Sequence, residues 1–129
     1  KLSAFVARRA QLVARYDRLL APLAPLVFPT NRRPRQNPGW HLYVALVDFQ
    51  ALGRSRAQLM ESLRAKGIGT QVHYIPVPHQ PYYSHLYGRP DLPGAEAYFQ
   101  HCLSLPLYPD LSDDDQDRVV DALFQEMRR

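Results

Sequence analysis

Residues 40–49, WHLYVALVDF, decide the fold class of this 129-residue chain. β-Branched and aromatic residues are frequent there and both alternating sets of positions are apolar, which predicts a central strand covered on both faces. Residues 68–74 (IGTQVHY) predict a second strand. Between the two strands, Ser55 and Gln58 have the spacing of a capping box, and the apolar residues after Ser55 have helical spacing. Gly67 is expected to end this helix in the left-handed conformation. We therefore expect a small α+β domain whose helices pack on one face of a sheet that contains antiparallel strands.

A long amphipathic helix is predicted before this unit. Apolar side chains recur at steps of three and four over residues 2–20, and Pro22 ends the pattern. Val27 and Phe28 favour a short extended piece. Residues 30–39 read as a polar, Pro-bearing loop, which holds the densest basic cluster of the chain: Arg32, Arg33 and Arg35.

The C-terminal half is predicted to begin with an irregular segment. Prolines and aromatic residues dominate residues 75–93, which excludes regular sheet and long helix. Residues 94–103 show helical spacing, and residues 104–108 read as a short apolar strand. Ser112 predicts the N-cap of a last helix, because three aspartates follow it in the first turn. The apolar face of that helix carries Val119, Val120, Leu123, Phe124 and Met127.

Composition excludes several classes of protein. No apolar run is long enough for a membrane span or a signal core, and Cys102 is the only cysteine, which excludes a disulfide scaffold. The net charge of +4 is spread out, and no nucleic-acid-binding motif has the required spacing, so we expect no nucleic-acid partner. The sequence favours a cytoplasmic globular domain. Because Lys1 falls directly into a helical period, we expect a piece of a longer protein.

Metal ligation and nucleophilic catalysis find little support in the sequence. His73, His79 and His85 lie six residues apart with prolines between them, which is not the spacing of a metal site. The three aspartates after Ser112 fit helix capping better than cation binding. Cys102 falls on an apolar face, where a buried, inert thiol is expected.

Aromatic and imidazole side chains give the densest remaining signal. Trp40 and His41 open one predicted strand, while His73 and Tyr74 close the other beside the Pro-rich segment. Strand ends that carry histidine and tyrosine beside a rigid loop are typical of a cleft wall. Ordinary packing of core and loop explains the same residues, and the sequence leaves the two interpretations open.

Three ordered blocks resemble a known family. They are WHLYVALVD (residues 40–48), GIGTQVHYIPVPHQPYY (67–83) and PGAEAYFQHCLSLPLYPDLSDDDQDRVVDAL (93–123), and residues 2–20 look like the interdomain helix of the same family. The chain is identified as similar, over almost its whole length, to the C-terminal part of the DegT/StrS-type sugar-nucleotide aminotransferases. The GTQVHYIPV stretch most resembles the pseudaminic-acid branch.

The resemblance implies a fold-type-I, pyridoxal-phosphate-dependent homodimer, with the active site between a large cofactor domain and this small one. It implies an interdomain helix at residues 1–24 and a small domain at 25–129. Amino transfer then runs from glutamate to C4 of a UDP-linked 4-keto-6-deoxy-N-acetyl sugar. Neither Lys1 nor Lys66 fits the family's cofactor lysine, so this chain by itself is expected to hold no cofactor and to be inactive.

By family position, the contacts to the nucleotide sugar are expected first at His73 and Tyr74. Further candidates for such contacts are His79, Tyr82, Trp40 and His41. The arginine cluster of residues 32–35 could approach a diphosphate, although a solvated loop explains it better. A different class of protein is a stand-alone interaction module that docks through the apolar face of residues 2–20. In either case we expect self-association through that face.

Overall fold

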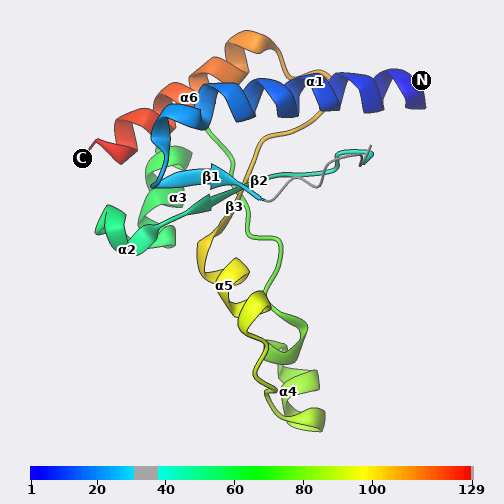
Figure 1. Cartoon of the computed structure of the whole chain (residues 1–129), viewed down its shortest axis with the longest axis vertical. Coiled ribbons are helices and arrows are strands. Elements are labelled where there is room, and N and C mark those ends of the chain that lie inside the picture. Colours follow the sequence, from blue (N-terminus) through cyan, green and yellow to red (C-terminus); the bar gives the residue numbers. More distant parts are fainter. Residues whose placement is uncertain (31–37, 129) are drawn as a thin grey trace.

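The computed structural model describes residues 1–30 and 38–128 (Figure 1). The predicted loop arginines, Arg32, Arg33 and Arg35, lie outside the described residues. The elements follow in this order: α1 (Leu2–Leu20), the 3-10 turn η1 (Ala21–Leu23), β1 (Val27–Pro29), β2 (Tyr43–Val47), α2 (Phe49–Leu52), α3 (Arg56–Ala65), the 3-10 turn η2 (Val77–His79), α4 (Pro81–Tyr87), α5 (Pro93–His101), β3 (Cys102–Leu105) and α6 (Asp113–Met127).

The strands of the described part form one antiparallel sheet in the order β1-β2-β3, so the predicted central strand is confirmed. Tyr43 pairs with Leu105 and Ala45 pairs with Leu103, while Val44 pairs with Ser104. Because side chains alternate along a strand, the first two pairs share one face and the third pair lies on the other. We call these the core face and the open face of the sheet.

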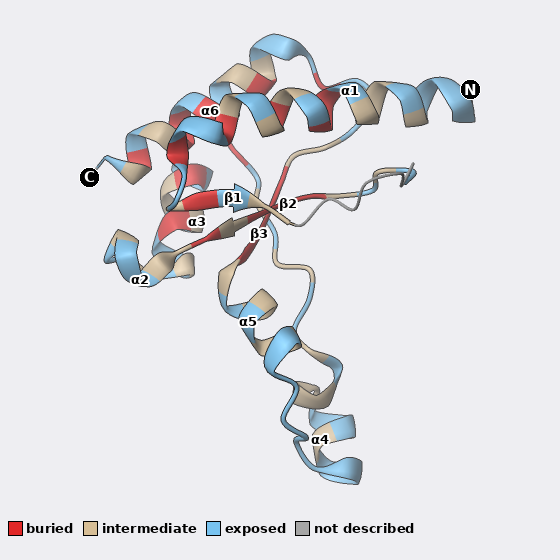
Figure 2. Ribbon diagram, in the orientation of Figure 1, coloured by how far each residue is buried: buried red, intermediate tan, exposed pale blue. Residues whose placement is uncertain are grey.

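Helices α1, α3 and α6 cover the core face, which confirms the α+β architecture (Figures 1 and 2). α1 lies along α6, and α3 packs against α6 from the other side. Their buried side chains join the core face in one apolar cluster, whose members include Leu12, Tyr16, Leu63, Leu103 and Leu123. The open face lies outside this cluster, although Val44, Cys102 and Ser104 on it are also buried.

Most of the apolar face of α1 is covered within the chain. Leu12, Val13, Tyr16 and Leu20 are buried among the sheet and α6. Among the large apolar residues of α1, only Leu2 and Phe5, in its first turns, are exposed. The expectation of docking and self-association along the whole face of residues 2–20 is therefore wrong for the second half of the helix.

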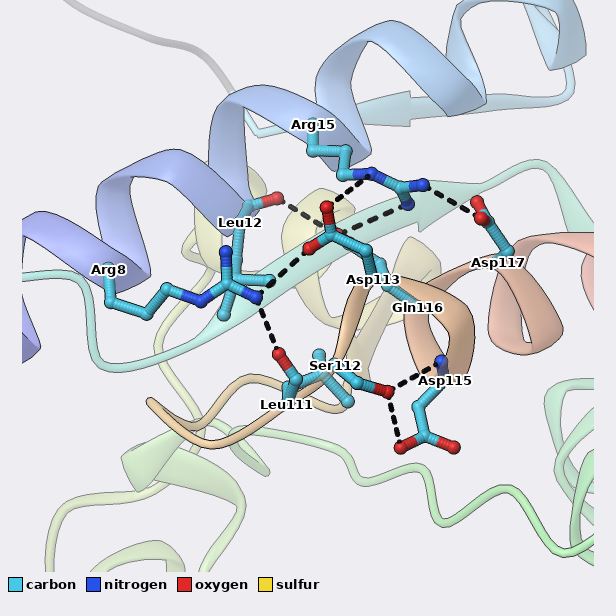
Figure 3. A network of polar contacts seen from close by, with 9 residues as sticks. All are labelled: Arg8, Leu12, Arg15, Leu111, Ser112, Asp113, Asp115, Gln116 and Asp117. Atoms are coloured by element: carbon cyan, nitrogen blue, oxygen red, sulfur yellow. Dashed lines mark hydrogen bonds and ion pairs between the residues drawn. The ribbon is translucent and has the colours of Figure 1, made fainter.

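Polar contacts fix α1 against the start of α6 (Figure 3). Arg15 donates to Asp117 Oδ2 at 2.8 Å, and Arg8 pairs with Asp113 at 3.0 Å. Gln116, which is buried, donates to a backbone carbonyl of α1 at 2.8 Å. The hydrogen bond from Arg15 lowers the pKa of Asp117, so this pair stays ionised at neutral pH.

The predicted helix boundaries that depend on caps are confirmed. Ser55 and Gln58 form a reciprocal capping box at the start of α3, and Gly67 has a positive φ of 77° after its end. The Ser112 hydroxyl accepts from the backbone N–H of Asp115 at 3.0 Å at the start of α6. These contacts join residues only three positions apart, which is why the sequence reveals them.

Two predicted strands are wrong in place or kind. Residues 68–74 form no strand, and within the described chain Gln71 makes a single bridge to Ser104. β3 has only four residues, so it offers few backbone groups to residues 68–74. Prolines at 76 and 78 follow that segment and prevent the pairing from continuing. β3 also begins at Cys102 rather than at residue 104, because Leu103 and Leu105 must pair with β2 before Pro106 ends the strand. The short helix α2 was not predicted.

Candidate functional site

Residues 74–92, which we call the arm, extend away from the helices and the sheet (Figure 1). The arm includes η2 and α4, and its ribbon is mostly exposed (Figure 2). The exposed large apolar residues of the described chain concentrate here: Tyr74, Ile75, Val77, Tyr82, Tyr83, Leu86, Tyr87 and Leu92. Exposed apolar groups on a projecting segment indicate a contact surface.

His73 connects the arm to the open face of the sheet. Its Nδ1 lies 2.8 Å from Ser104 Oγ, and Tyr98 Oη donates to the His73 carbonyl at 2.9 Å. The backbones of Gln71 and Ser104 exchange hydrogen bonds of 3.2 and 2.8 Å immediately beside this site. β3 and α5 thus hold His73 from two directions, and its ring is half-buried.

Tyr74 lies at the root of the arm with 67% of its surface exposed. Its ring meets the His73 ring edge to face, with centroids 4.7 Å apart. An exposed phenol beside a fixed imidazole offers one stacking surface and two polar groups to a ligand. The structure thus brings together the two residues that the sequence placed first.

His79 of the arm has its partners in α5. Its Nε2 lies 2.6 Å from Glu96 Oε1, and its ring meets Phe99 edge to face at 6.4 Å. Both partners belong to α5. This side chain ties η2 to α5, so its geometry indicates support of the arm.

The other predicted site residues do not join His73. Tyr82 is exposed in α4, where its ring packs edge to face on Tyr83 at 5.2 Å. Trp40 is half-buried and packs against the core cluster, whereas His41 is exposed before β2. Both residues precede β2, which starts only at Tyr43.

Tyr98 and Ser104 were missed by sequence reasoning. Burial raises the pKa of Tyr98, so its phenol keeps the proton that it donates to His73. Ser104 is a lone hydroxyl between Leu103 and Leu105 in an apolar strand, and that was the available signal. Burial also raises the pKa of Cys102, which agrees with the predicted inert thiol.

The lysines of this chain do not fit a pyridoxal-phosphate site. Lys66 follows α3, where its Nζ lies 2.8 Å from both Glu126 Oε1 and Gln125 Oε1. These contacts direct the amine at α6. Lys1 is exposed at the start of α1.

Residues 1–30 and 38–128 contain no group of three or more histidine, cysteine or acidic side chains placed to hold a metal ion. Within the same residues, no helix has both the length and the apolar character needed to cross a bilayer.

Known proteins share this fold. A curated relative, the spore coat polysaccharide biosynthesis protein SpsC of Bacillus subtilis, is 39% identical over 90% of this chain and 30% of its own length. The solved structure of DesV from S. venezuelae in complex with a ketimine intermediate is 33% identical, with a TM-score of 0.85 over 98% of this chain and 33% of that one. PseC of Helicobacter pylori, an aminotransferase involved in the biosynthesis of pseudoaminic acid, has a TM-score of 0.85 at 23% identity over 96% and 33%.

The chain has the fold of one part of these solved structures. A family model matches residues 1–124, and the chain belongs to the DegT/DnrJ/EryC1/StrS aminotransferase family. Members of this family use pyridoxal phosphate for amino transfer to nucleotide sugars. The chain spans about a third of the length of the relatives that it matches.

Proposed function

We propose that this chain is the small C-terminal domain of a sugar-nucleotide aminotransferase and that it supplies substrate-facing residues to the active site. The observation that carries the proposal is the placement of His73 and Tyr74. Both lie where the open face of the sheet meets the arm, and β3 and α5 fix the position of His73. In this proposal His73 hydrogen-bonds the nucleotide sugar and Tyr74 packs against it.

The proposed reaction moves an amino group from glutamate to C4 of a UDP-linked 4-keto-6-deoxy-N-acetyl sugar. The structural likeness to PseC supports the fold of this proposal, and the GTQVHYIPV stretch supports the substrate class. Pyridoxal phosphate supplies the electron sink for such transfers. The chain's lysines do not fit that cofactor, so in this proposal a large domain binds it and this chain alone is inactive. The complete enzyme is proposed to be a homodimer.

The proposed boundaries are an interdomain helix at residues 1–24 and the small domain at residues 25–129. The first turns of α1 are exposed (Figure 2), Leu2 and Phe5 among them, which supports an interdomain role for the start of this helix. In the assembled enzyme these residues would meet the large domain, while Leu12 to Leu20 remain part of the small-domain core.

Replacing the matched segment of SpsC with this chain tests the function. We expect the chimera to transaminate the proposed sugar. In the chimera, His73→Ala should lower kcat/KM for the amino acceptor roughly tenfold, because one hydrogen bond to the substrate is lost. Tyr74→Phe should have a smaller effect. The matched control is His85→Ala, an exposed histidine of α4. A folded, cofactor-loaded chimera whose acceptor kinetics ignore both substitutions would remove these residues from the site.

The arm is expected to dock on the large domain. The combined change of Tyr82, Leu86 and Tyr87 to serine should leave the free energy of unfolding of this chain within about 1 kcal/mol, because all three are exposed. Binding to the separately produced large domain of SpsC should weaken at least tenfold by calorimetry. Tyr108→Ser, an exposed tyrosine outside the arm, is the control. Undiminished binding of the triple variant would contradict the proposal.

A further inference from the structure

The hydrogen bond between Ser104 and His73 has a direction that the surroundings fix. Ser104 lies on the open face of the sheet with only 4% of its surface exposed. Its Oγ lies 2.8 Å from His73 Nδ1. Within the described residues, the Ser104 hydroxyl makes no other hydrogen bond. The serine hydrogen therefore has one available acceptor, the Nδ1 lone pair.

The opposite direction leaves a buried donor without a partner. A neutral imidazole carries one hydrogen, on Nδ1 or on Nε2. If Nδ1 carried it, that N–H would point at Ser104 and the serine hydrogen would have no acceptor. Buried donors without acceptors are costly, so the serine donates and the imidazole hydrogen resides on Nε2.

The backbone around the pair keeps this geometry in place. Gln71 and Ser104 exchange two backbone hydrogen bonds, and Tyr98 Oη binds the His73 carbonyl. Among the described residues, His73 Nε2 makes no hydrogen bond, and it lies on the other side of the ring from Nδ1, which contacts Ser104. Because Nδ1 is already hydrogen-bonded and the ring is held in place, Nε2 is the nitrogen that remains for a ligand.

We propose that Ser104 is a positioning residue that keeps the hydrogen of His73 on Nε2, so that His73 donates a hydrogen bond to an oxygen of its ligand. The ligand group is a carbonyl, hydroxyl or phosphate oxygen and not an N–H group. The identity of the ligand as a nucleotide sugar rests on the proposed function. The assignment of the hydrogen rests on the Ser104 contact alone.

Long-range ¹H–¹⁵N spectra of the whole chain, labelled in histidine, test the assignment near pH 8, where an ordinary imidazole is neutral. We expect His73 to show a bare Nδ1 and a protonated Nε2. In Ser104→Ala the Nδ1 resonance should move toward that of a free lone pair, and the Nδ1-protonated fraction should rise roughly three- to tenfold, the effect of one lost hydrogen bond. Ser104→Thr keeps the hydroxyl and should restore the spectrum. Ser84→Ala removes a hydroxyl that bonds the Pro81 carbonyl in α4 and should change nothing at His73.

A wild-type spectrum with the hydrogen on Nδ1 would overturn the inference, even if Ser104→Ala fails to fold. Unchanged His73 nitrogens in a folded Ser104→Ala would overturn it as well. Acceptor kinetics in the SpsC chimera separate this inference from the proposed function. If the spectra confirm the tautomer and His73→Ala leaves kcat/KM for the sugar unchanged, the assignment of the hydrogen stands and the proposed contact of His73 with the sugar fails.

Discussion

Tyr16→Ala is expected to lower the free energy of unfolding by about 3–5 kcal/mol, the range for removing a large buried aromatic side chain. Tyr16 is fully buried in α1, and its ring packs on that of Tyr43 with centroids 4.6 Å apart. Its Oη donates to the Pro106 carbonyl at 3.0 Å, which joins α1 to the end of β3. Urea unfolding at pH 7 measures the effect. A loss below about 1 kcal/mol would contradict the packing described.

Tyr16→Phe separates the hydroxyl from the ring and predicts a change with pH. The loss at pH 7 should be about 1 kcal/mol, for one hydrogen bond. Burial, with a smaller contribution from Tyr108, raises the pKa of Tyr16 well above its usual value near 10. The phenol therefore stabilises the fold fully below about pH 10, and this contribution is lost as pH rises, because the unfolded chain ionises first. In Tyr16→Phe the decline of stability above pH 10 should be shallower than in the wild type.

Glu126→Gln is expected to cost about 3 kcal/mol, at the low end for breaking a buried ion pair. Glu126 has no exposed surface, and its carboxylate meets Arg54 Nη1 at 2.5 Å and Lys66 Nζ at 2.8 Å. Both cations are partly exposed, so water recovers some of their solvation after the change. Because these two residues flank α3, the loss should loosen α3 from α6.

Urea unfolding of Glu126→Gln at pH 7 checks this second prediction. Asp121→Asn is the matched control, since Asp121 is an exposed acid on the same helix, and it should change the free energy of unfolding by no more than about 0.5 kcal/mol. Equal effects of the two substitutions would show that the buried ion pairs of Glu126 add nothing to the free energy of unfolding.

Much of the fold could be predicted from the sequence because its signals are local. The capping box at Ser55 and the N-cap at Ser112 join residues one helical turn apart, so they are legible without a structure. The central strand was legible because both of its faces are apolar. The error at residues 68–74 arose because an extended, apolar stretch becomes a strand only where a partner offers free backbone groups, and here Ser104 offers one bridge.

The candidate site was predictable in part. His73 and Tyr74 are adjacent in the chain, so any fold would keep them together. Trp40 packs against the core cluster, and its place in the site stays a prediction, because sequence alternation does not tell which face of a sheet a distant residue meets. Glu96, the partner of His79, gave no sequence signal of its role, since an acid in the first turn of a helix has an ordinary capping function.

The sequence by itself determined the capped helices and the central strand. Only the tertiary structure decided what holds His73, because Ser104 lies 31 positions and Tyr98 25 positions away along the chain. The register of β3 against β2 places Ser104 on the open face, and a slip of one residue would turn that hydroxyl into the core. That register follows from the burial of Leu103 and Leu105 against the helices, which is a property of the assembled core and not of any local stretch.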